Sequence, residues 1–101
     1  MQTEYQSPVT GAEIFFDYIG QLYADSISPT LSLPERQDLT NRIKSLSDNQ
    51  RKQIHAAIGL QELLSDVAGD YRQSDYWSNL AAYFRRSFTW REFRVVNGRK
   101  N

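Results

Sequence analysis

Cysteine is absent from this chain of 101 residues. Its absence excludes disulfide bonds, thiolate zinc sites and cysteine nucleophiles together. It also fits a reducing compartment, where disulfides are rare. The first ten residues, MQTEYQSPVT, contain neither a basic region nor an apolar run of the kind found in secretory signals. We therefore expect a cytoplasmic location.

Long apolar runs are also missing. The longest stretches of consecutive apolar residues cover only a few positions, whereas a helix that spans a bilayer needs about 20. The five glycines stand at positions 11, 20, 59, 69 and 98, too scattered for a P-loop or a dinucleotide-binding turn. The sequence predicts one soluble domain over residues 1–101, with flexible ends at 1–9 and 98–101.

The net charge is zero, but the charges are unevenly spread. Residues 1–50 carry seven acidic and three basic residues, and residues 51–101 carry five acidic and nine basic residues, so the halves have charges of −4 and +4. The last 17 residues alone carry +5. Such polarity suits a polyanionic partner, or self-association of oppositely charged ends. Composition leaves both open.

Helix starts are indicated at four places by the capping-box spacing, in which a Ser or Thr side chain accepts from a backbone N–H three residues on. The pairs are Thr10…Glu13, Ser32…Glu35, Ser47…Gln50 and Thr89…Glu92. Ser74-Asp75 offers a simpler cap. With the apolar periodicity that follows them, these caps predict helices over residues 11–26, 33–46, 48–68, 75–88 and 90–96. A strand is the alternative for the last segment, although nothing else in the chain would pair with it.

The third of these helices is apolar around most of its circumference, which is typical of a helix surrounded by others. The sequence therefore predicts an all-α fold, a compact bundle of four to five helices around a central third helix. Gly69 is expected just after the end of that helix. Gly20 and Gly59 lie inside predicted helices, each at a cost of about 1 kcal/mol relative to Ala. Close helix–helix approach is the favoured explanation, and a hinge or a bound ligand is the alternative.

Patterns for catalysis or metal binding are weak. His55, the only histidine, is expected near Glu62 and Asp66 on the polar side of the third helix. That spacing lacks the second histidine of a helical zinc pair and the Glu-x-x-His pairs of di-iron bundles. No G-x-S-x-G turn marks a nucleophilic serine. We therefore expect a solvated polar face at His55, and a chain that is not an enzyme and has no catalytic residue, metal site or cofactor.

Aromatic and basic residues gather towards the C-terminus, where eight of the thirteen aromatic residues lie between positions 71 and 93. In the predicted helix 75–88 the rings share one face and the arginines avoid it, so we assign Trp77, Leu80 and Phe84 to the core. After that helix, rings and charges share the same surface. The residues predicted to bind a partner are Arg85, Arg86, Trp90, Arg91, Phe93 and Arg94.

Two functions compete for this surface. Tyr, Trp and Arg are frequent hot spots of protein interfaces. They favour a small non-catalytic adaptor or regulatory protein that binds a protein partner, or itself as a salt-sensitive homodimer, through the aromatic–basic C-terminal surface. The same residue types stack on bases and neutralise phosphates, so a nucleic-acid-binding helical module is the alternative. The zero net charge weighs against it, as does the linker DYRQS, which lacks the Gly of a helix-turn-helix turn.

Overall fold

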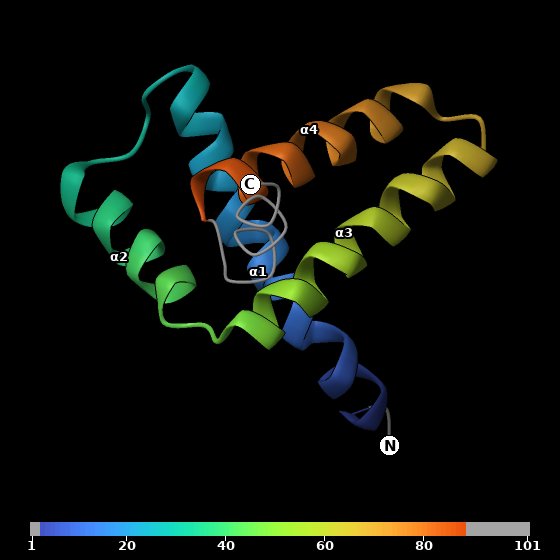
Figure 1. Cartoon of the computed structure of the whole chain (residues 1–101), viewed down its shortest axis with the longest axis horizontal. Coiled ribbons are helices and arrows are strands. Elements are labelled where there is room, and N and C mark those ends of the chain that lie inside the picture. The colour runs from blue at the N-terminus through green and yellow to red at the C-terminus, as the bar shows by residue number, and fades with distance from the viewer. Residues whose placement is uncertain (1–2, 89–101) are drawn as a thin grey trace, which may run out of the picture.

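A computed structural model of the chain describes the backbone of residues 3–88 and the side chains of residues 12–88. Four helices follow one another: α1 (Thr3–Ile27), α2 (Leu33–Lys44), α3 (Asp48–Val67) and α4 (Tyr71–Ser87) (Figure 1). Residues 3–88 contain no strand, and the predicted all-α bundle is confirmed with four helices. The fifth predicted helix, residues 90–96, and its capping box at Thr89 lie outside the described residues.

Two of the predicted capping boxes begin helices as expected. Ser32 Oγ accepts from the backbone N–H of Glu35, and the Glu35 carboxylate accepts from the backbone N–H of Ser32 at 2.8 Å. The same reciprocal pair joins Ser47 to Gln50 at the start of α3. Each box satisfies two backbone donors that the first turn of a helix cannot satisfy itself, so local sequence alone defines these two starts.

Two other predicted starts are wrong. Thr10 does not cap a helix, because α1 begins at Thr3 and the backbone around Thr10 is already helical. Ser74-Asp75 does not begin α4, which starts at Tyr71. The N-cap of α4 is Asp70, whose Oδ1 accepts from the backbone N–H of Gln73 at 3.2 Å. A cap at Asp70 leaves the segment DYRQS within the N-terminal part of α4 rather than in a linker.

The turn between α3 and α4 is short and contains a glycine. Gly69 has φ +80°, a left-handed conformation that glycine adopts without steric cost. Its N–H donates to the carbonyl of Asp66 at 3.0 Å, and the N–H of Asp70 donates to Ser65 at 2.9 Å. This pair of bonds is the Schellman motif, which confirms the predicted place of Gly69. The segment DYRQS, whose lack of glycine was used as an argument against a helix-turn-helix, is therefore not the turn between these two helices.

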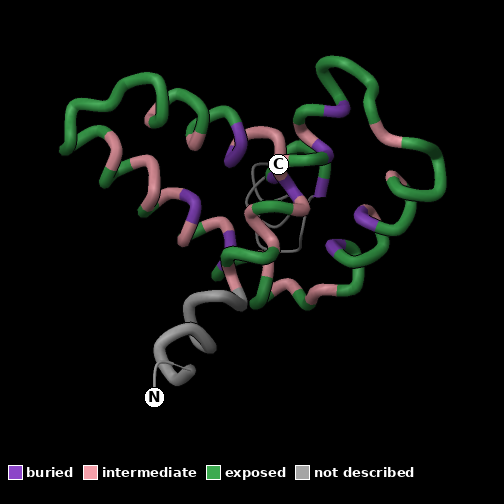
Figure 2. The backbone as a smooth tube through the Cα atoms, turned by 180° about the vertical axis from the view of Figure 1, so that it is seen from behind, coloured by how far each residue is buried: buried purple, intermediate pink, exposed green. Residues whose placement is uncertain are grey.

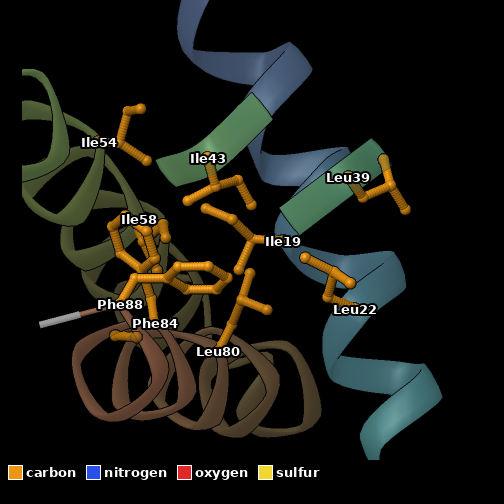
Figure 3. Packing of buried hydrophobic residues seen from close by; sticks show 10 residues of the cluster. Ile19, Leu22, Leu39, Ile43, Ile54, Ile58, Leu80, Phe84 and Phe88 are labelled. Atoms are coloured by element: carbon orange, nitrogen blue, oxygen red, sulfur yellow. The ribbon is translucent and has the colours of Figure 1, made fainter. Parts of the chain in front are cut away.

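The core lies where the four helices meet, and each helix supplies apolar side chains to it (Figure 3). The buried apolar residues are Ile19, Leu22, Leu39, Ile43, Ile54, Ile58, Leu80, Ala81, Phe84 and Phe88. The assignment of Leu80 and Phe84 to the core is confirmed, since neither is exposed to solvent. Trp77 is partly buried at the edge of the core, where its ring lies 5.4 Å from that of Phe16 on α1.

The helices divide unequally around this core. α1 contacts each of the other three helices, whereas α3 packs mainly against α4. Figure 1 shows α3 and α4 as a hairpin that extends away from α2, with the turn at residues 68–70 at its far end. Only Ile54 and Ile58 of α3 are buried, so α3 differs from the predicted central helix. Among the helices of residues 3–88, the second half of α3 lies beside α4 alone (Figure 1).

Candidate functional site

The predicted partner-binding residues that the structure describes lie on the last turn of α4. Arg85 and Arg86 are both exposed there. Arg85 Nη1 lies 3.0 Å from Nε2 of His55 on α3. The guanidinium carbon of Arg86 lies 5.9 Å from the centre of the Tyr83 ring, a cation–π contact. Both guanidinium groups thus have a contact within the chain. The other predicted residues, Trp90, Arg91, Phe93 and Arg94, lie outside the described residues.

His55 does not lie on a solvated polar face as predicted. It is half-buried between α3 and α4, and its ring stacks on Phe84 with 6.4 Å between centroids. Burial lowers the pKa of His55, and the positive charge of Arg85 lowers it further. A guanidinium only donates hydrogen bonds, so Nε2 of a neutral His55 accepts and the ring proton lies on Nδ1. His55 thus connects two helices, a role that spacing along one helix could not indicate.

Acidic residues of α3 do not form a metal site with His55. Among residues 12–88, His, Asp and Glu side chains nowhere gather in threes at distances suited to a metal ion. In the described part of the chain, no helix is long and apolar enough to cross a membrane.

A buried ion pair joins α1 to α2, and the sequence analysis missed it. Asp25 is the only buried charged residue among those described. Its Oδ2 accepts from Arg36 Nε at 2.6 Å, and its Oδ1 accepts from the backbone N–H groups of Thr30 and Leu31 at 2.9 and 3.0 Å. The Arg36 hydrogen bond, followed by these two backbone bonds, holds the pKa of Asp25 well below its ordinary value. This network fixes the α1–α2 loop and is structural.

Exposed apolar side chains gather on the second half of α3. We call Leu60, Leu63, Leu64 and Val67 the leucine surface; they are 53%, 56%, 53% and 78% exposed. At 100° per residue they share one side of α3, whereas the buried Ile54 and Ile58 lie on nearly the opposite side. Four large apolar side chains within eight residues form a contiguous patch, and such patches mark interaction sites.

The polarity of this part of the molecule is inverted. We call residues 60–76, which comprise the second half of α3, the turn and the start of α4, the distal hairpin. Its least exposed residues are polar: Gln61, Glu62, Ser65 and Ser74. Its most exposed apolar residues are those of the leucine surface and Tyr71, which is 69% exposed. Figure 2 shows that no buried segment reaches this end of the hairpin. The arrangement favours a hairpin whose outer face is covered by another molecule.

Comparison with known proteins gives no independent indication of function, because no family model, curated protein or solved structure matches the chain.

Proposed function

We propose that this chain is a small, non-catalytic protein-interaction module that binds its partner through the leucine surface of α3. The inverted polarity of the distal hairpin carries this proposal. Burying one Leu side chain contributes about 1.5–3 kcal/mol, so a partner that covered this surface would gain substantial binding energy. A surface that reacts chemically or binds an ion would instead need polar groups, and none of the four residues of the leucine surface is polar.

The proposal moves the predicted binding site from the C-terminal arginines to α3. Arg85 contacts His55 of α3, so using Arg85 for a partner would break a contact between α3 and α4, and Arg86 contacts Tyr83 within α4. The leucine surface can be covered without breaking any contact within the molecule. The nucleic-acid-binding alternative depends on the aromatic–basic segment rather than on α3, so a titration with oligonucleotides separates the two.

The proposal is tested by site-specific photocrosslinking, which the absence of cysteine makes simple. Ala56 is exposed one turn before Leu60 on the same side of α3. An Ala56→Cys variant carries a benzophenone at this position and is irradiated in an extract of its own cells. We expect a discrete crosslinked species, whether it contains a different protein or a second copy of this chain.

The matched control uses the same substitution at another exposed leucine. Leu60→Glu with Leu64→Glu should remove the crosslinked species, because binding would bury two carboxylates in an apolar contact without partners. Leu33→Glu, at the 60% exposed Leu33 on α2, should leave it unchanged. If no discrete species forms, or if Leu33→Glu removes it equally, the leucine surface is not the binding site.

A further inference from the structure

The outward side of α3 has the spacing of a coiled-coil seam. Exposed residues recur at alternating intervals of four and three positions, which keeps them on one side of a helix that packs along a second helix. They are Asn49, Gln53, Ala56, Leu60, Leu63 and Val67. We propose, resting on the proposed function, that the partner is a second copy of this chain and that the two α3 helices pack antiparallel along the part of this seam from Ala56 to Val67.

The chemistry of the seam suits a second copy better than a charged partner. None of its six residues is charged, and Leu64 beside it is apolar as well. A charged partner would have no counter-charge along the seam, whereas a second copy needs none. The chain as a whole has zero net charge, so two copies approach without net repulsion. An isologous dimer, in which one patch meets itself, is also the commonest closed assembly.

The charges on α3 determine the orientation of the two helices. Near its start α3 carries Asp48, Arg51 and Lys52, with a net charge of +1, and near its end it carries Glu62 and Asp66, with a charge of −2. Antiparallel packing brings the basic start of one helix closer to the acidic end of the other than to its basic start. Parallel packing sets like charges side by side, which weakens association. The helix dipoles favour the antiparallel arrangement as well.

The spacing of the side chains also determines the register. An antiparallel pair centred between residues 61 and 62 places Leu60 of one copy opposite Leu63 of the other, and Ala56 opposite Val67. The small Ala56 then faces the large, 78% exposed Val67, so that the two copies interlock. The hairpin extends away from α2 (Figure 1), and the residues of the leucine surface on its outer side are each more than half exposed. Because this contact is smaller than a standard interface, we expect a dissociation constant of about 1–100 µM.

Sedimentation equilibrium of the purified full-length chain tests the dimer. We expect a monomer–dimer equilibrium that is unchanged or strengthened between about 0.05 M and 0.5 M NaCl, because salt screens charges but does not weaken apolar contacts. Leu60→Glu with Leu64→Glu should raise the dissociation constant at least tenfold, and Leu33→Glu should not change it. Circular dichroism verifies that each variant is helical. If the Leu60/Leu64 variant does not fold, the crosslinks below decide the question.

Cysteine crosslinking tests the orientation without disturbing the leucines. Under mild oxidation, a mixture of Ala56→Cys and Val67→Cys chains should form mixed disulfides, because the two positions face each other. Val67→Cys alone should form few, since two copies of position 67 are separated by about 16 Å along the seam of an antiparallel pair. Efficient Val67→Cys homodimers with few mixed disulfides would show a parallel pair and overturn the proposed orientation.

The outcomes separate this inference from the proposed function. A monomer up to several hundred micromolar overturns the dimer. The leucine surface is still supported as a binding site if a photocrosslink to a different protein is removed by Leu60→Glu with Leu64→Glu and kept in Leu33→Glu. A dimer that salt dissociates and that Leu60→Glu with Leu64→Glu leaves intact overturns the seam. That result would instead indicate association through the oppositely charged halves of the chain.

Discussion

A single buried carboxylate fixes the connection between the first two helices. Asp25 is near the end of α1, and its partner Arg36 is eleven positions later on α2. Arg36 also donates to the carbonyl of Leu31 at 3.1 Å, so one guanidinium holds both the carboxylate and the loop. Sequence reasoning could not find this pair, because neither helical spacing nor a turn motif relates positions 25 and 36.

Removal of the Asp25 carboxylate should destabilise the fold. Asp25→Ala leaves Arg36 and two backbone N–H groups without their acceptor, and we expect the melting temperature to fall by about 5 °C or more. Asp25→Asn keeps an oxygen for the backbone donors and should cost less. Asp38→Ala, at the exposed pair with Arg42, is the control and should change the melting temperature by about 1 °C or less. Thermal unfolding followed by circular dichroism measures all three.

The same carboxylate predicts the response to acid. The pKa of Asp25 in the folded chain lies below the value of about 3.9 that it takes when unfolded. The unfolded chain therefore binds the proton more readily, and the stability that Asp25 contributes is complete above pH 4 and is lost as the pH falls below it. Urea unfolding from about pH 6 to pH 2 should show a shallower loss in Asp25→Asn than in the wild type. The same loss of stability with falling pH in both proteins would contradict this role of Asp25.

His55 gives a second pH response, in a higher window. Its pKa in the folded chain is lowered from the ordinary value of 6.5, first by burial and then by Arg85. Because the unfolded chain takes up the proton first, stability is full above pH 6.5 and decreases as the pH falls below it. As the only histidine, His55 gives one imidazole signal set in NMR. We expect it to titrate below pH 6.5 and to move towards 6.5 in Arg85→Ala; a pKa above 6.5 in the wild type would exclude the Arg85 contact.

At the scale of helices, a helix start could be predicted from the sequence when all the groups that form its cap lie close together along the chain. The caps at Ser32 and Ser47 were predictable because every group involved lies within four residues. The start of α4 was not, because Asp70 and Ser74-Asp75 both suit an N-cap and only the Schellman turn at Gly69 decides between them. The start of α1 was missed because a capping-box spacing also occurs by chance inside a helix.

The glycines inside helices divide into two kinds. A Cβ at Gly20 would lie 2.9 Å from the hydroxyl oxygen of Tyr76 on α4, so close approach explains this glycine as predicted. Gly59 has open space around it, and the same explanation fails there. Gly69 also has space, but its φ of +80° disfavours any side chain.

Three alanine substitutions test that division. Gly59→Ala should raise the free energy of unfolding by up to about 1 kcal/mol, since Ala is the better helix former and meets no neighbour. Gly69→Ala should lower it by about 1 kcal/mol because of its left-handed backbone. Gly20→Ala should raise the free energy of unfolding by less than Gly59→Ala does, because the Tyr76 ring must move. Urea denaturation at low micromolar protein concentration measures all three, and a destabilised Gly59→Ala would show that the space is occupied.

At the scale of the whole molecule, periodicity predicted the bundle but not which faces meet. α3 has two apolar sides, and the apolar periodicity alone predicts burial for both Ile54 and Leu60. In the fold, the first half of α3 lies against α1 and α4, while the second half extends beyond α1 and leaves its leucines exposed. How far each helix extends past its neighbours depends on the lengths of all four, so the leucine surface could not be located from the sequence.

The arrangement of charge over the molecule bears on the nucleic-acid alternative. Most of the arginines between residues 12 and 88 contact groups of the same chain. Arg36 pairs with Asp25, Arg42 with Asp38, and Arg51 donates to the carbonyl of Lys44 at 2.9 Å. With the contacts of Arg85 and Arg86, these interactions engage five of the six arginines between residues 12 and 88 within the chain, so few of these arginines are left to form a basic face. Dedicated nucleic-acid binders usually carry such a face.

We therefore expect no binding when labelled mixed-sequence single- and double-stranded oligonucleotides are titrated with the chain and followed by fluorescence anisotropy. Low salt is the stringent condition, because binding driven by phosphate neutralisation is strongest there. A flat titration at about 0.05 M salt would leave the leucine surface as the binding site to pursue. Micromolar binding that weakens steeply with salt and is abolished by Arg91→Ala with Arg94→Ala would favour nucleic-acid binding over protein binding. The C-terminal segment would then be the functional site. If Leu60→Glu with Leu64→Glu bound the oligonucleotide as tightly as the wild type does, α3 would take no part in that binding.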